Sequence, residues 1–277
     1  MPAEPMSSDP STTAPPTSVL TLEKDAGVAT VTLRRPRAMN ALDRELKEAL
    51  LAALTDVAQD PAVRCVVLTG EGPAFCVGQD LKQHVQDLQE GSSALGTTVV
   101  EHYNPIVVLL ATMNKPVVAA LNGVAAGAGA SFAFAADVRI LVEGAGINLA
   151  FAGIALSCDS GASWSLPRLV GPAKAKELLF QPRTLSSAEC LDLGLVTRVV
   201  PAETFAETVT EVARTLAAGP TLAYGSIRRA VAFSAGHPLE ESLAHEAELM
   251  TMTGHSADHA AAVAAFLAKE RPVFHGA

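Results

Sequence analysis

Two glycine-rich segments contain the residues whose types and spacing point to chemistry. One is PAFCVGQDLK at 73–82, and the other is NGVAAGAGAS at 122–131. Each follows a short apolar run and precedes a predicted helix. Glycine permits backbone conformations that expose N–H groups, and the first N–H groups of a helix have no intrahelical partner. Two such turns facing each other would hold a developing negative oxygen between two peptide donors. We therefore expect chemistry on a carbonyl, with stabilisation of an enolate.

The elements around these turns alternate between strands and helices. Alternation of this kind predicts an α/β core with largely parallel strand pairing. Residues 83–93 fit either a loop or a frayed helix. We expect strands at 19–24, 28–33, 65–69, 117–121 and 138–142, and helices at 43–57, 99–113 and 130–136.

The pattern becomes almost wholly helical from residue 173 onward. Ser186 and Glu189 form a capping-box pattern that starts one helix. A brief strand is expected at 196–200, followed by helices at 202–217, 220–234, 239–252 and 256–269. We divide the chain into a disordered leader at 1–18, a core at 19–200 and a helical C-terminal region at 201–277.

Composition narrows the class of protein. The 277 residues carry a net charge of −9, which disfavours a nucleic-acid surface because phosphate binding needs clustered Lys and Arg. The four cysteines form no CxxC pair and the histidines lack ligand spacing, so we expect no metal. The leader has no basic start followed by an apolar run, and no apolar stretch reaches membrane-spanning length. We expect a soluble, cytoplasmic protein that binds no membrane.

Several motifs, in a fixed order along the chain, resemble the crotonase (enoyl-CoA hydratase/isomerase) superfamily. As a set they are specific, although each alone is weak. The resemblance implies a spiral of repeated ββα units, a helical C-terminal trimerisation region and an assembly as a homotrimer or a dimer of trimers. It implies an acyl-CoA substrate and no cofactor beyond the coenzyme A of that thioester. The motifs are RPRAMNAL at 35–42, AFCVGQDL at 74–81, KPVVAALNG at 115–123, GAG at 127–129, SLPRLVG at 165–171 and AAFLAK at 264–269.

The resemblance also implies roles for individual residues. The two peptide donors to the thioester oxygen fall on Gln79 and Ala128. Lys82 would reach a phosphate of the coenzyme, and Phe266 with Lys269 would cover the adenine end, in the same or a neighbouring subunit. Asp80 would either face the adenine or brace its own turn. The remaining residues expected near the substrate are Cys76, Gly78, Gly127, Ser131 and Phe151.

The acid/base residues differ from the hydratase pattern. Hydratases of this superfamily carry two glutamates, and the corresponding positions here are Ser131 and Phe151. Phenylalanine has no proton to exchange and serine alone is a poor base, so hydration is disfavoured. Asp159, in CDSGASW at 158–164, resembles the working aspartate of the ring-epoxide isomerase branch and of aryl-CoA dehalogenases. Cys158 and Ala162 replace a proline and a glycine of that pattern.

Asp159 has a simpler interpretation as the N-cap of the helix that follows. As a base it would need a pKa raised by desolvation, which Phe151 and Ile154 could provide. We therefore predict an enoyl-CoA isomerase, with an enoyl-CoA hydratase and a non-catalytic acyl-CoA-binding homologue as alternatives. The sequence GASFA at 129–133 only nearly matches the nucleophile elbow of serine hydrolases, and GAGASF at 127–132 is no dinucleotide fingerprint.

Overall fold

The computed structural model describes residues 18–89 and 94–277, with the backbone alone at 94 and 95. The predicted leader therefore lies outside the described residues except for residue 18. Among the helices of the described ranges, none is long and apolar enough to cross a membrane.

The main sheet has six strands in the order β1-β2-β3-β5-β7-β10. Strands β1 and β2 form an antiparallel hairpin, and every later pairing in this sheet is parallel. The predicted strands and their parallel pairing are thus confirmed. The strands are β1 (Leu20–Asp25), β2 (Val28–Leu33), β3 (Cys65–Gly70), β5 (Val117–Leu121), β7 (Val138–Val142) and β10 (Arg198–Val200).

A second, four-stranded sheet was not predicted. Its strands have three residues each, in the order β4-β6-β8-β9. Three residues are too few to show an alternating apolar pattern, and Gly and Ala dilute that signal further. The pairing β4–β6 is parallel and joins the two glycine-rich segments. The strands are β4 (Ala74–Cys76), β6 (Val124–Ala126), β8 (Gly146–Asn148) and β9 (Thr184–Ser186).

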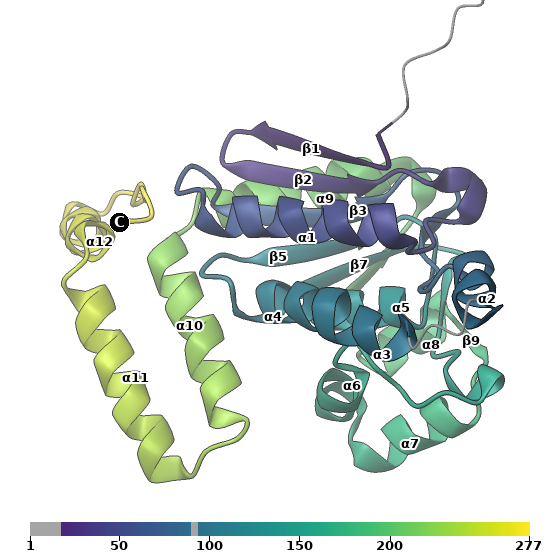
Figure 1. Cartoon of the computed structure of the whole chain (residues 1–277). Coiled ribbons are helices and arrows are strands. Elements are labelled where there is room, and N and C mark those ends of the chain that lie inside the picture. The colour runs from purple at the N-terminus through teal and green to yellow at the C-terminus, as the bar shows by residue number, and fades with distance from the viewer. Residues whose placement is uncertain (1–17, 90–93) are drawn as a thin grey trace, which may run out of the picture.

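Helices cover both faces of the main sheet (Figure 1). Helices α1 (Arg44–Gln59) and α4 (Asn104–Thr112) pack on one face, and α9 (Ala202–Ala217) packs on the other. The strand β3 is buried on both faces, as expected for a central parallel strand. Asp43 caps α1 by accepting from the Leu46 amide at 2.9 Å. The short helix α5 (Ala128–Phe134) is entirely buried.

The ambiguous segment 83–93 is helical in its described part, since α2 spans Leu81–Gln89. Residues 90–93 lie outside the described ranges. The predicted helix 99–113 begins as a π-helical turn, η2 (Val99–Tyr103), and continues as α4. The wide π turn alters the direction of the side chains at its end, including Tyr103. Helix α3 (Ala94–Thr98) precedes it, and short 3-10 turns occur at η1 (Pro36–Ala38) and η3 (Ala152–Ile154).

The four helices beyond residue 201 were predicted in the correct order. Helix α8 (Ser187–Asp192) begins with the expected capping box between Ser186 and Glu189. Helices α10 (Thr221–Ser234) and α11 (Leu239–Gly254) form a hairpin that stands apart from the sheet, with α12 (Ala257–Ala268) at its end (Figure 1). Helices α6 (Ala162–Val170) and α7 (Pro172–Phe180) pack together below the second sheet.

Arg228 of α10 joins this hairpin to the core. Its guanidinium donates to the carbonyl oxygens of Leu110, Met113 and Lys115 and pairs with Asp137 at 2.8 Å. The side chain is only 8 % exposed. A single buried cation thus satisfies three carbonyl groups in and just after the last turn of α4, where the end of a helix leaves acceptors without intrahelical donors.

Candidate active site

One cavity of about 380 Å³ brings together three residues that are far apart in the sequence: Gln79, Ala128 and Asp159. Gly127 and Phe151 also line it, as expected, and apolar side chains of Ile154 and Leu156 extend its wall. The cavity therefore combines two peptide groups from the glycine-rich turns with one carboxylate and an apolar surface.

The Gln79 N–H is directed away from the strand-like pairing that surrounds it. Leu42 donates to the Gly78 carbonyl at 2.8 Å, and Asp80 donates to the Leu42 carbonyl at 3.2 Å. In a trans peptide the C=O and N–H point in opposite directions. The Gly78 carbonyl faces Leu42, so the Gln79 N–H of the same peptide faces the other way. Within the described ranges this N–H donates to no other protein group.

The Ala128 N–H has a similar geometry. It is the first residue of α5, so it has no intrahelical acceptor. The Gly127 carbonyl accepts from the Ser131 amide and from its hydroxyl, both at 3.1 Å. The carbonyl therefore points along the helix and the Ala128 N–H points out of its N-terminal end. Among the described residues it has no protein acceptor either.

The two turns pack backbone against backbone. Gly78 has φ +83°, and a Cβ built on it would lie 3.0 Å from the Ala126 carbonyl oxygen. A Cβ on Gly129 would lie 2.2 Å from the Cys76 carbonyl oxygen, which no real side chain tolerates. Glycine at these two positions is thus required by close approach of the chains. This contact fixes the two exposed amides relative to each other.

Asp159 is half-buried beside the two amides. Desolvation raises the pKa of its carboxyl above the ordinary value, and a hydrogen bond from the Ser160 hydroxyl, at 2.9 Å, offsets part of that rise. Ser160 has φ +52°, so its side chain turns back toward Asp159. The predicted N-cap role is not observed, because the N-cap of α6 is Gly161 and no side chain caps it.

Two further polar side chains line the cavity and were not identified from the sequence. Tyr103, only 1 % exposed, donates its hydroxyl to the side-chain oxygen of Gln79. His84 of α2 also lines the cavity. In the sequence, Tyr103 is a polar aromatic residue within an apolar helical stretch. Such a residue belongs to the hydrophobic core as readily as to an active site, so the sequence alone did not single it out.

Some predicted contact residues do not reach the cavity. The Cys76 and Ser131 side chains are fully buried, and neither is among the residues that line the cavity. The Ser131 hydroxyl instead donates to the Gly127 carbonyl, which also removes it as an elbow nucleophile.

Asp80 braces its turn, which was one of its two expected roles. It pairs with Arg35 at 2.9 Å and accepts from the Lys82 amide at 2.9 Å. The Lys82 side chain is exposed and does not line the cavity. Phe266 is 81 % exposed on α12, and Lys269 ends that helix. Helices α12 and α2 lie at opposite ends of the molecule (Figure 1). Within one chain, these two residues cannot contribute to the cavity.

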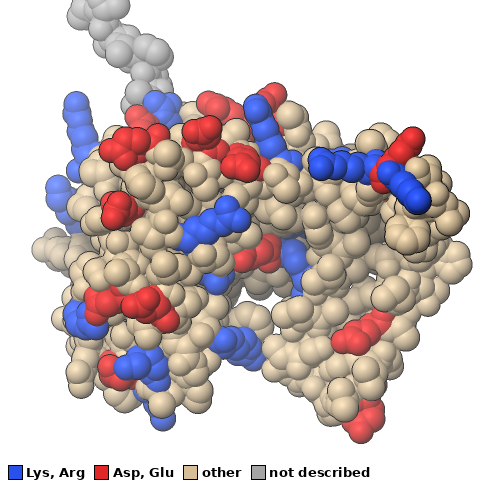
Figure 2. All heavy atoms as spheres, turned by 180° about the vertical axis from the view of Figure 1, so that it is seen from behind, with Lys and Arg blue, Asp and Glu red and all other residues tan. Residues whose placement is uncertain are grey.

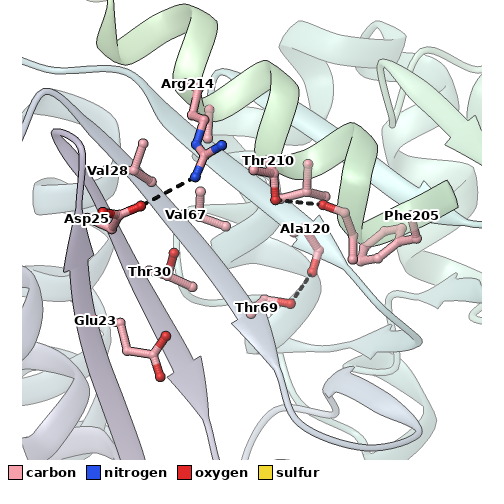
Figure 3. A pocket seen from close by; sticks show the side chains of 13 residues that line it. Glu23, Asp25, Val28, Thr30, Val67, Thr69, Ala120, Phe205, Thr210 and Arg214 are labelled. Atoms are coloured by element: carbon pink, nitrogen blue, oxygen red, sulfur yellow. Dashed lines mark hydrogen bonds and ion pairs between the residues drawn. The ribbon is translucent and has the colours of Figure 1, made fainter.

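A second cavity of about 370 Å³ lies between α9 and the outer face of β1, β2, β3 and β5 (Figure 3). Some of its polar groups are engaged with neighbouring protein groups. Arg214 pairs with Asp25 at 3.4 Å, and the Thr69 hydroxyl donates to the Ala120 carbonyl at 2.8 Å. None of the predicted catalytic residues lines it, so the first cavity is the candidate active site.

The fold and the first cavity together define a class of protein. It is an α/β spiral of ββα units, and two of its turns present peptide N–H groups beside a carboxylate. The comparisons agree. Residues 23–277 match the model of the enoyl-CoA hydratase/isomerase family, and the chain belongs to that family. The predicted fold class is thereby confirmed.

Known relatives in this family have different activities. The chain is 39 % identical to the 1,2-epoxyphenylacetyl-CoA isomerase of Escherichia coli, over 91 % of this chain and 96 % of the relative. It is 32 % identical to 4-chlorobenzoyl coenzyme A dehalogenase-2 of Arthrobacter sp., over 85 % of this chain and 86 % of that relative. A solved enoyl-CoA hydratase from Polaromonas sp. JS666 superposes with a TM-score of 0.86 at 32 % identity, covering 92 % of this chain and 99 % of the other.

Proposed function

We propose that the protein is an acyl-CoA isomerase that works through an enolate. Asp159 would remove a proton from the carbon beside the thioester carbonyl, or from the vinylogous carbon. The electron pair moves onto the thioester oxygen, where the Gln79 and Ala128 amides stabilise the charge. The proton, carried by Asp159, returns to a different carbon. The net result is a double-bond shift or a ring-epoxide rearrangement.

The single observation that carries this proposal is the convergence of two uncommitted amides and one carboxylate of raised pKa on one cavity. A carboxylate with a raised pKa is a stronger base toward a weakly acidic C–H than an ordinary one. The proposal needs no metal and no cofactor beyond the coenzyme A of the substrate, because the thioester accepts the electron pair.

The acyl group is proposed to be unsaturated and largely apolar. The side chains of Phe151, Ile154 and Leu156 form an apolar wall, which suits an alkenyl or aromatic chain. The name of the Escherichia coli relative, an isomerase of 1,2-epoxyphenylacetyl-CoA, supports an aromatic-derived substrate.

We also propose that the chain acts as a homotrimer or a dimer of trimers. The α10–α11 hairpin exposes large apolar side chains, including Val231, Leu243 and Met250 at 67 %, 53 % and 72 %. The lower part of this hairpin carries few charged side chains on the face in Figure 2. Light scattering coupled to size-exclusion chromatography would measure the mass in solution.

The function is tested with a panel of acyl-CoA esters in heavy water, followed by mass spectrometry. An isomerase releases a product that contains the same heavy atoms as its substrate, and deuterium replaces one hydrogen wherever the proton on Asp159 exchanges with solvent before it returns. Hydration would instead add one molecule of heavy water and would favour the hydratase alternative, with Asp159 positioning water. Tight binding of every ester with neither exchange nor product would indicate a non-catalytic acyl-CoA-binding homologue.

A further inference from the structure

Lys47 of α1 is a buried amine that the proposed reaction does not use. It is 3 % exposed, and its Nζ donates to the Thr98 hydroxyl at 3.0 Å and to the Gln79 side-chain oxygen at 3.4 Å. In the described part of the chain no carboxylate lies within ion-pair distance of it. Burial lowers the pKa of this amine. A buried cation without a counter-ion is costly, so its position calls for an explanation.

The Gln79 side chain is held from two sides. Lys47 approaches its oxygen from α1, and the Tyr103 hydroxyl donates to the same oxygen from the end of η2. The Lys47 Nζ also lies 5.7 Å from the centre of the Tyr103 ring, in cation–π range. Three elements that are distant in the sequence therefore meet at one carboxamide.

The main chain at this point needs such support. The Gly78–Gln79 peptide carries the donor N–H, and Gly78, at φ +83°, has no side chain of its own to anchor this peptide. Leu42 holds the carbonyl side of the peptide through its 2.8 Å hydrogen bond. A fixed Gln79 side chain restrains the other side, because both groups branch from the same Cα.

We propose that Lys47 and Tyr103 are positioning residues that clamp the Gln79 side-chain oxygen and so keep the Gln79 N–H aimed into the cavity. The inference rests on the proposed role of that N–H as a donor to a thioester carbonyl. Misalignment of an oxyanion donor weakens it steeply, so the clamp would act on the bound carbonyl rather than on the rest of the substrate.

Lys115 is a matched control. It is also a buried lysine, 5 % exposed, with a pKa lowered by burial. Its Nζ donates to the main-chain oxygens of Val57 and Asp60, at 2.7 and 2.8 Å, and no part of it lines the cavity. Its replacement should affect stability alone.

The test measures binding of two ligands by calorimetry: an acyl-CoA thioester, and the CoA thioether in which CH2 replaces the carbonyl. Their affinity ratio reports the hydrogen bonds to the carbonyl without requiring turnover. We expect Lys47→Met and Tyr103→Phe each to lower this ratio about tenfold, the value of one good hydrogen bond. Lys115→Met should leave the ratio unchanged. A ratio unaltered in both Lys47→Met and Tyr103→Phe would overturn the inference.

A double-mutant cycle separates the clamp from general destabilisation. Gln79→Met keeps the backbone N–H but removes the clamped oxygen. In that background Lys47→Met and Tyr103→Phe should lower the ratio no further, and fully additive losses would contradict the clamp. If the wild-type ratio is already one, the carbonyl site itself, and with it the proposed function, fails. If Lys47→Met does not fold, Tyr103→Phe carries the same test.

Discussion

Gly78 lies directly against the Ala128 amide: a Cβ on Gly78 would stand 3.2 Å from the Ala128 nitrogen. The two donors proposed for the thioester oxygen are therefore neighbours across a backbone contact, although 49 residues separate Gln79 from Ala128 in the chain. The predictions that follow depend on this arrangement and on Asp159 beside it.

Gly78→Ala should impair catalysis far more than stability would explain. The added methyl group would crowd the Ala128 N–H, and φ +83° disfavours any L side chain. We expect kcat to fall about 100-fold or more, the scale of losing one oxyanion donor. Gly144→Ala is the matched control, since Gly144 has φ +82° with open space around it. Equal kcat in the two variants would contradict the donor role.

Asp159→Asn should abolish turnover while leaving the protein at least as stable. Loss of a positioned base costs about 100-fold or more in kcat. A folded-state pKa raised by burial means that the charged carboxylate destabilises the fold at neutral pH, so a neutral amide removes that cost. Thermal unfolding at pH 7 and steady-state kinetics check both parts. Retained kcat would eliminate Asp159 as the base.

The pH profile should follow the Asp159 carboxyl. The base acts when deprotonated, so kcat/KM should fall as the pH drops through a pKa above the ordinary aspartate value. Ser160→Ala removes the hydrogen bond that lowers this pKa, so the acidic limb should move to higher pH. The Ser242 hydroxyl of α11 donates to the carbonyl of Pro238, the N-cap of that helix, so Ser242→Ala should not move the limb. A shift of the limb to lower pH in Ser160→Ala would be incompatible with this assignment.

Arg228→Met should detach the α10–α11 hairpin from the core. It leaves the carbonyls of Leu110, Met113 and Lys115 without their donor. We expect the free energy of unfolding to fall by about 3 kcal/mol, as for buried hydrogen bonds to a charged group. Arg214→Met breaks an exposed pair with Asp25 and should cost about 0.5 kcal/mol or less. Chemical denaturation measures both, and equal losses would show that burial of Arg228 contributes little.

Alkylation should select Cys158. Burial raises the pKa of Cys65 and Cys76 to about 12 and that of Cys190 to about 11, so their thiolates are scarce. Cys158 is half-buried and accessible. Iodoacetamide at pH 8 should modify one thiol per chain, and peptide mapping should locate it at Cys158. Prior modification of Cys76 would indicate that the first turn opens in solution.

Local sequence patterns were sufficient to predict most of the helices and strands of the fold. Long strands such as β3 and β5 are continuous apolar runs, and α1 and α9 have clear helical spacing and ends. The short strands β4 and β6 gave no such pattern, because three residues, several of them Ala, carry little periodic signal. Their pairing is nonetheless what brings the two turns together.

The sequence by itself determined the two exposed-amide turns, because glycine spacing and helix starts are local properties of the chain. It also indicated Asp159 as the available carboxylate. Only the tertiary structure decided which groups share a cavity: Cys76 and Ser131 turn into the core, while Tyr103 and Lys47 converge on the Gln79 side chain. The reason is physical: side-chain direction and burial depend on packing between segments far apart in the chain, and no local pattern encodes those contacts.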